Sequence, residues 1–153
     1  MFKSVASLAV GLMFCQVAWV GAITFAVTKL DDTNDGSCDA DCSLREAVIA
    51  ANALAGADEI LLPPGTIVYS IPGTGEDQAA TGDLNILDSV DIIGDPAQGT
   101  TVDADELDRV FQVTGMSTVA TFENLTIRNG LSGGPAGGID ISRASVTLRN
   151  VFM

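Results

Sequence analysis

Two acidic segments of this chain carry residue types that bind cations or transfer protons. The first, residues 31–39, reads Asp-Asp-Thr-Asn-Asp-Gly-Ser-Cys-Asp. Hard cations such as Ca²⁺ bind several carboxylate and carbonyl oxygens on a flexible, glycine-containing loop. The match to an EF-hand loop is poor, because Thr33 stands at the third ligand position and Cys42 where a bidentate Glu belongs. We assign no metal site, expect a solvated turn before a helix, and leave calcium binding open.

The second segment, residues 103–109, reads Asp-Ala-Asp-Glu-Leu-Asp-Arg. Paired carboxylates can hydrolyse glycosides, and some β-helix proteins cleave acidic polysaccharides with calcium and a basic residue. The chain has no histidine for general-base catalysis. Arg109 among acids is more often an ion pair, and spacing along one loop does not define a geometry. We therefore predict no catalytic residue, no bound cofactor and no enzymatic activity, with Asp105 and Arg109 as the pair to test.

Residues 38–47, Cys-Asp-Ala-Asp-Cys-Ser-Leu-Arg-Glu-Ala, predict how a helix begins. Ser43 and Glu46 fit a capping box, in which the Ser side chain bonds the N3 amide and the Glu bonds the Ser amide. Apolar residues at helical spacing extend to Ala55, and Gly56 is a natural stop. Cys38 and Cys42 are close enough to form a disulfide in an oxidising compartment. Two free thiols or half of a metal site are the alternatives.

The same segment resembles the CSLREA domain of exported bacterial proteins, named for the letters at positions 42–47. The similarity continues through nearly all of the predicted mature chain, in Leu-Pro-Pro-Gly-Thr at 62–66, Ala-Thr-Gly-Asp-Leu at 80–84 and Leu-Thr-Ile-Arg-Asn-Gly at 125–130. The resemblance implies a right-handed parallel β-helix in a secreted or surface protein. It implies no defined chemical activity.

Residues 1–22 have the pattern of a signal peptide. Lys3 precedes a largely apolar run, and Val20-Gly21-Ala22 is an acceptable cleavage site. A transmembrane anchor is the alternative, but the run is short and no basic cluster follows. A lipoprotein signal is disfavoured because the bulky Phe14 precedes Cys15. We expect no membrane span after cleavage.

The chain is strongly acidic, with a formal net charge of −13. Cleavage after Ala22 would remove Lys3 and no acidic residue, which makes the net charge −14. Nucleic acid is a poor partner for such a surface, because its binding requires neutralisation of phosphates. The acidity is consistent with solubility in an exported protein.

Past Gly56, short apolar runs alternate with turn residues, which is typical of strands. One repeat is visible, because Leu-Thr-Ile-Arg-Asn at 125–129 recurs as Val-Thr-Leu-Arg-Asn at 146–150, an offset of 21 residues. A fixed period near twenty indicates a solenoid, and we expect Asn129 to stack on Asn150. A leucine-rich repeat and an antiparallel β-sandwich are the alternatives. The predicted organisation is a signal peptide (1–22), a loop and capping helix (23–56) and β-helix rungs (57–153).

These features predict a secreted or cell-surface β-helix module, adhesin-like and structural or binding in role. Extracellular glycans or surface proteins are the expected partners. The alternative is a polysaccharide-active enzyme, a lyase or glycoside hydrolase, or a fragment of one. The last rung has apolar residues and no polar cap, so we expect it to continue into, or pack on, further β-helix and to self-associate when isolated.

Overall fold

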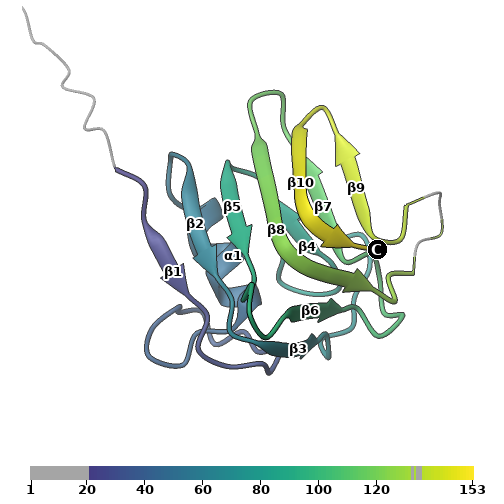
Figure 1. Cartoon of the computed structure of the whole chain (residues 1–153). Helices are drawn as coiled ribbons and strands as arrows, with labels where there is room; N and C mark the ends of the chain where they lie inside the picture. Colours follow the sequence, from purple (N-terminus) through teal and green to yellow (C-terminus); the bar gives the residue numbers. More distant parts are fainter. Residues whose placement is uncertain (1–20, 132, 134–135) are drawn as a thin grey trace, which may run out of the picture.

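A computed structural model of the chain describes residues 21–131, 133 and 136–153. The predicted signal peptide falls almost wholly outside these residues. Within them lie one α-helix and ten β-strands (Figure 1). The elements, in chain order, are β1 (Thr24–Ala26), α1 (Leu44–Asn52), β2 (Asp58–Leu61), β3 (Gly65–Val68), β4 (Leu84–Ile86), β5 (Val90–Ile93), β6 (Thr100–Asp103), β7 (Phe111–Thr114), β8 (Val119–Arg128), β9 (Ile139–Ser142) and β10 (Ser145–Phe152).

The strands form a parallel β-solenoid of about three turns, which confirms the predicted β-helix with one short helix. Every strand pairing in the described residues is parallel. A seven-stranded sheet has the order β1-β2-β5-β8-β6-β3, with β10 also paired to β8. A second sheet has the order β4-β7-β9.

The long strand β8 bends the first sheet into two faces. Its N-terminal half pairs with β5 and its C-terminal half with β6 (Figure 1). The bend lies at Asn124, which has a left-handed backbone with φ 56°. Asparagine tolerates this conformation better than most residues with a side chain. We call the face of β1, β2, β5 and the first half of β8 the flat face, and the face of β3, β6 and the second half of β8 the corner face.

Apolar side chains from successive rungs stack in columns along the solenoid interior. Ile60, Ile92 and Phe122 are register partners on the flat face, and all three are fully buried. Ile67, Val102 and Ile127 form the matching column on the corner face. This alternation, with polar residues between the buried ones, is the period of two that places one set of side chains inside.

The expected repeat of 21 residues is wrong, because β10 lies on β8 with an offset of 26. Val146 pairs with Ala120, and Val151 pairs with Leu125. Asn150 therefore stacks on Asn124 rather than on Asn129, and its Nδ2 donates to Asn124 Oδ1 at 2.9 Å. Both asparagines have positive φ, so the strands align where each turns the corner. The amide of Asn129 instead donates to Asp103.

The helix is shorter than predicted, and two strands were not predicted. α1 ends at Asn52 rather than Ala55. The Asn52 side chain binds strand β4 and the segment after it: Nδ2 donates to Asn85 O at 2.7 Å, and Oδ1 accepts from Leu87 N at 2.9 Å. The unpredicted strands are β1 and β6; β6 includes Asp103, which the sequence placed in a loop.

Candidate functional site

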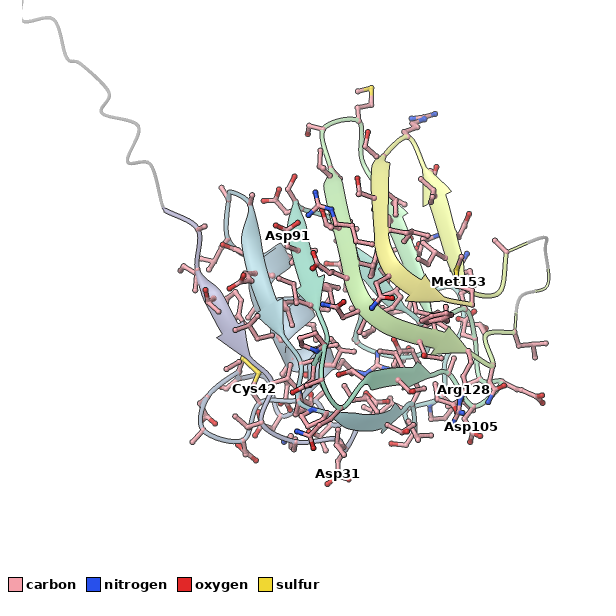
Figure 2. All side chains as sticks on the ribbon, viewed as in Figure 1. Asp31, Cys42, Asp91, Asp105, Arg128 and Met153 are labelled. Atoms are coloured by element: carbon pink, nitrogen blue, oxygen red, sulfur yellow. A yellow bond between two sulfur atoms is a disulfide. The ribbon has the colours of Figure 1, made fainter. Side chains whose placement is uncertain are left out.

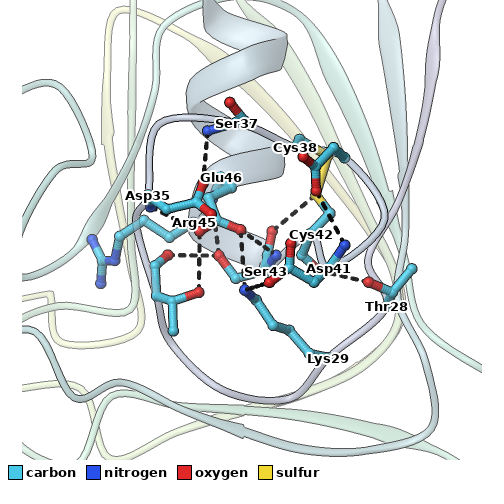
Figure 3. A network of polar contacts seen from close by, with 12 residues as sticks. Thr28, Lys29, Asp35, Ser37, Cys38, Asp41, Cys42, Ser43, Arg45 and Glu46 are labelled. Carbon is cyan, nitrogen blue, oxygen red and sulfur yellow. Dashed lines mark hydrogen bonds and ion pairs between the residues drawn. A yellow bond between two sulfur atoms is a disulfide. The ribbon is translucent and has the colours of Figure 1, made fainter.

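The N-terminal cap contains the disulfide predicted from the sequence. Cys38 and Cys42 are joined, with an S–S distance of 2.03 Å (Figure 3). Directly after it, Ser43 caps α1 with a complete capping box. Ser43 Oγ accepts from Glu46 N at 3.1 Å, and Glu46 Oε2 accepts from Ser43 N at 2.7 Å. The box thus satisfies two amides at the buried start of the helix.

Glu46 also holds the preceding loop in place. Its Oε1 accepts from the hydroxyl of Thr33 at 3.1 Å and from the amide of Asp35 at 3.0 Å. Burial would raise the pKa of this carboxyl, but the bonds from the Ser43 and Asp35 amides and the Thr33 hydroxyl outweigh burial and lower it. The carboxylate therefore stays charged inside the cap and ties the loop to the helix.

Arg45 is the residue of this segment that sequence reasoning missed. It is 1% exposed, and its Nε donates to Asp32 Oδ1 at 2.6 Å while Nη2 donates to Asp32 Oδ2 at 3.1 Å. The guanidinium also donates to the carbonyls of Ala79 and Gly82 and lies over the ring of Tyr69. One side chain thus joins the loop before α1 to the loop before β4. The sequence signal for this buried ion pair was a basic residue in a helix that is otherwise largely apolar.

The acidic loop 31–39 does not gather its carboxylates around one point. Asp32 is committed to Arg45 and accepts from the amides of Ser70 and Ile71. Asp35 accepts from the amide of Ser37, two residues later. Within residues 21–131, 133 and 136–153, no three His, Cys, Asp or Glu side chains lie close enough to hold a metal ion. The loop is built from Asx turns and the Arg45 ion pair.

The residues of the candidate catalytic segment 103–109 do not come together in one site. Asp103 is buried and accepts from Arg128 Nε at 2.7 Å and from Asn129. Burial acts to raise the pKa of Asp103, but hydrogen bonds from the Asp105 amide, Arg128 and Asn129 hold it below its ordinary value. Asp105 and Glu106 are exposed and have left-handed backbones.

Arg109 lies elsewhere, on the outer side of the second sheet. Its Nε donates to Asp83 at 2.8 Å, and its Nη1 donates to Asp140 at 3.2 Å. Asp83 is fully buried, and this desolvation raises its pKa despite the ion pair with Arg109. Asp105 and Arg109, the pair singled out from the sequence, therefore have separate surroundings.

A row of three threonines, followed by a phenylalanine, crosses the outer side of the corner face. Thr66, Thr101 and Thr126 are register partners on β3, β6 and β8, and Phe152 on β10 continues the row. Beside this row lies a groove of about 290 Å³, walled by the loop at 95–99 and by Asn124 and Asn150. We call it the corner groove. The loop between β5 and β6 protrudes, whereas the next rungs turn tightly at Asn124 and Asn150, which leaves the space.

A second depression, of about 670 Å³, borders the first. Its lining includes Thr66, which both hollows share, together with Asp31 and Asp105 from the two acidic segments. Apolar side chains from Leu30, Val68 and Leu107 complete it. We call it the acidic hollow; Asp31 and Asp105, which line it, are labelled in Figure 2. Together the two hollows give the corner face a contoured and largely polar surface.

Comparison with family models, with curated proteins and with solved structures finds no match to this chain. Among the described residues, no helix is long and apolar enough to cross a membrane.

Proposed function

We propose that this chain is a binding module of an exported, CSLREA-type protein, displayed at the cell surface or secreted, with no catalytic activity of its own. The corner face is its binding surface, and an uncharged glycan is its ligand. The observation that carries this proposal is the row of Thr66, Thr101 and Thr126, which lines the corner groove and reaches the acidic hollow at Thr66.

The chemistry of the lining favours sugar hydroxyls. Threonine hydroxyls and the amides of Asn124 and Asn150 can each donate and accept hydrogen bonds. Phe152, 67% exposed at the end of the row, offers an apolar surface for the carbon face of a sugar ring. Sites for small ligands combine such apolar contacts with a few placed polar groups.

Charge selects against acidic ligands. Among the described residues that line the two hollows, none is lysine or arginine, whereas Asp31, Asp95 and Asp105 are present. The chain as a whole has a net charge of −13. A polyanion would meet repulsion without a counter-charge, so an uncharged chain fits this face better.

A peptide ligand is less favoured at the centre of the corner face, over β6, although the hollows also reach the edge strands β3 and β10. Extended peptides commonly bind by adding a strand to a free sheet edge. In β6, the backbone is already paired on both sides, to β3 and to β8. Recognition at β6 must therefore come from side chains.

Affinity electrophoresis through soluble uncharged polysaccharides, a β-glucan and a mannan, tests this proposal. We expect retardation of the wild type that falls at least about fivefold in Thr126→Val, which removes one hydroxyl and keeps the shape. Thr121→Val is the matched control, since Thr121 is also half-buried on β8 but lies on the flat face. Equal loss in both variants, or no retardation by either polymer, would contradict the proposal.

A polysaccharide-cleaving activity is the second candidate, because Asp31 and Asp105 line one hollow. Incubation with acidic polysaccharides and calcium, followed by assay of new unsaturated or reducing ends, tests it. Turnover that disappears in Asp105→Asn would establish this activity over binding alone. Asparagine suits the left-handed backbone of position 105, so the variant should fold. Arg109→Ala probes the other residue of the predicted pair.

A further inference from the structure

Asp58, the first residue of β2, is a buried carboxylate with an incomplete set of partners. It is 4% exposed, and its Oδ1 accepts from the backbone N–H of Ile23 at 2.9 Å. Its Oδ2 is buried and has no hydrogen-bond partner among the described residues. A buried carboxylate oxygen without a donor is unfavourable, and such groups in native proteins usually have a specific explanation.

The basic side chains nearest in sequence are committed elsewhere. Lys29 contacts Asp41 and Glu46, at 3.2 and 3.7 Å. Arg45 forms an ion pair with Asp32. The nitrogen of Ile23, which already donates to Oδ1, is well placed to supply the missing donor.

Ile23 is the residue that follows the predicted export cleavage site. We propose that cleavage after Ala22 converts the Ile23 nitrogen into an α-ammonium group and that Asp58 is its buried counter-ion. An export peptidase hydrolyses the Ala22–Ile23 bond: the C–N bond breaks, water gives its oxygen to the new Ala22 carboxylate, and its two protons go to the nitrogen, which becomes –NH₃⁺. One N–H then keeps the bond to Oδ1, and two further donors become available to Oδ2.

The backbone holds Ile23 in position for this pairing. Its carbonyl accepts from Glu59 N at 2.9 Å, and Thr24 pairs with Glu59 in the parallel register of β1 and β2. The other charged groups on the neighbouring strands and their preceding turn are acidic, namely Glu59, Asp88 and Asp91. All of them favour the charged form of the amine, but Asp91 is exposed on β5, with β2 between it and β1, so solvent screens its effect most. Processing would thus stabilise the first rung.

The inference rests on the export that is part of the proposed function, but its test does not require glycan binding. Processed protein, exported from the full-length precursor, is compared with a form that retains Gly21 and Ala22. Each is made with Asp58, with Asp58→Asn, and with Asp91→Asn as the control that removes an exposed carboxylate from β5. Thermal unfolding and the rate of α-amine acylation at pH 7 are measured for all of them.

We expect the processed form to melt at least about 3 °C above the extended form, as about 1 kcal/mol does for a domain of this size. The difference should vanish in Asp58→Asn and persist in Asp91→Asn. We also expect the Ile23 amine to react about tenfold more slowly than that of an unstructured peptide, which is one unit of raised pKa.

Equal melting temperatures together with peptide-like amine reactivity would overturn the proposal. The acylation rate keeps the test decisive if Asp58→Asn folds poorly. An exported protein whose intact mass shows a first residue other than Ile23 would also overturn it. Glycan retardation of the same protein, measured separately, shows whether the proposed binding function survives that result.

Discussion

The two ends of the solenoid are built differently from the same parallel strands. At the N-terminal end, α1 contacts β1, β2 and β4, and Arg45 joins two loops through a fully buried ion pair. At the other end, β10 has β8 as its only strand neighbour among the described residues. The same interior column that buries Ile92 completely leaves Leu148 43% exposed on β10. Among the described residues, α1 covers the first rung, whereas nothing covers β10 in this way.

The largest difference should appear when an arginine is removed from each end. Arg45→Met leaves Asp32 buried without its counter-ion, and we expect a loss of about 3–5 kcal/mol in the free energy of unfolding. Arg149→Met is the matched control, because Arg149 is 64% exposed in its side chain and lies 3.6 Å from Glu123. It should cost less than about 1 kcal/mol. Urea unfolding of both variants measures this, and similar losses would contradict a structural role for Arg45.

Two leucines provide the next comparison. Leu125 on β8 is 1% exposed, whereas Leu148 on β10 is 43% exposed. Leu125→Ala should destabilise by about 2–5 kcal/mol through the cavity that it leaves. Leu148→Ala should cost about 1 kcal/mol, since much of that side chain already contacts solvent. If the two substitutions cost the same in denaturant unfolding, β10 is covered in solution and the contrast between the ends is wrong.

Reduction of the Cys38–Cys42 disulfide should have a smaller effect. The loop that it closes holds five residues, so chain entropy predicts a loss of about 2 kcal/mol. The loss should be confined to the capped end and leave the β8–β10 pairing intact. Thermal unfolding with and without reductant measures it, and alkylation followed by mass spectrometry confirms the redox state. No change on complete reduction would show that the capping box and Arg45 hold the loop unaided.

The smallest expected effect is a pH dependence at the cap. Because the folded pKa of Glu46 is lowered from its ordinary 4.5, its contribution is fully present above about pH 4.5. It is lost as pH falls through the lower folded value, when protonation weakens the bonds to Ser43 and Asp35. Glu46→Gln should therefore reduce the fall in stability between pH 5 and 3 relative to the wild type. An unchanged slope in that variant would contradict the assigned role of the carboxylate.

Local patterns predicted the elements of the fold better than the contacts between them. The capping-box pattern of Ser43 and Glu46 predicts where the helix begins, and alternating apolar positions predict most of the strands. The offset between rungs was misjudged because Leu-Thr-Ile-Arg-Asn and Val-Thr-Leu-Arg-Asn resemble each other in letters, whereas stacking is decided by which asparagine turns the corner. Asn124 and Asn129 both have positive φ, and only the register separates them.

The candidate site was predicted only in part, for the same reason. Asp31 and Asp105 were both singled out, but their common hollow depends on β3 lying between them. Asp32 is 13 residues from Arg45, and Gly82 is 37 residues from it. Spacing along the sequence does not predict contacts between residues so far apart. The Arg45–Asp32 ion pair and the row of Thr66, Thr101 and Thr126 can be identified only when the register of the rungs is known.

Native-state hydrogen exchange tests the contrast between the two ends most directly. Amides of β2, which lies between β1 and β5 and contacts α1, should exchange only through global unfolding. Amides of β10 should exchange at least about tenfold faster through local opening, with little dependence on denaturant. Protection of β10 equal to that of β2 would contradict the account, because it would mean that β10, with one strand neighbour among the described residues, is as stable as the rung covered by α1.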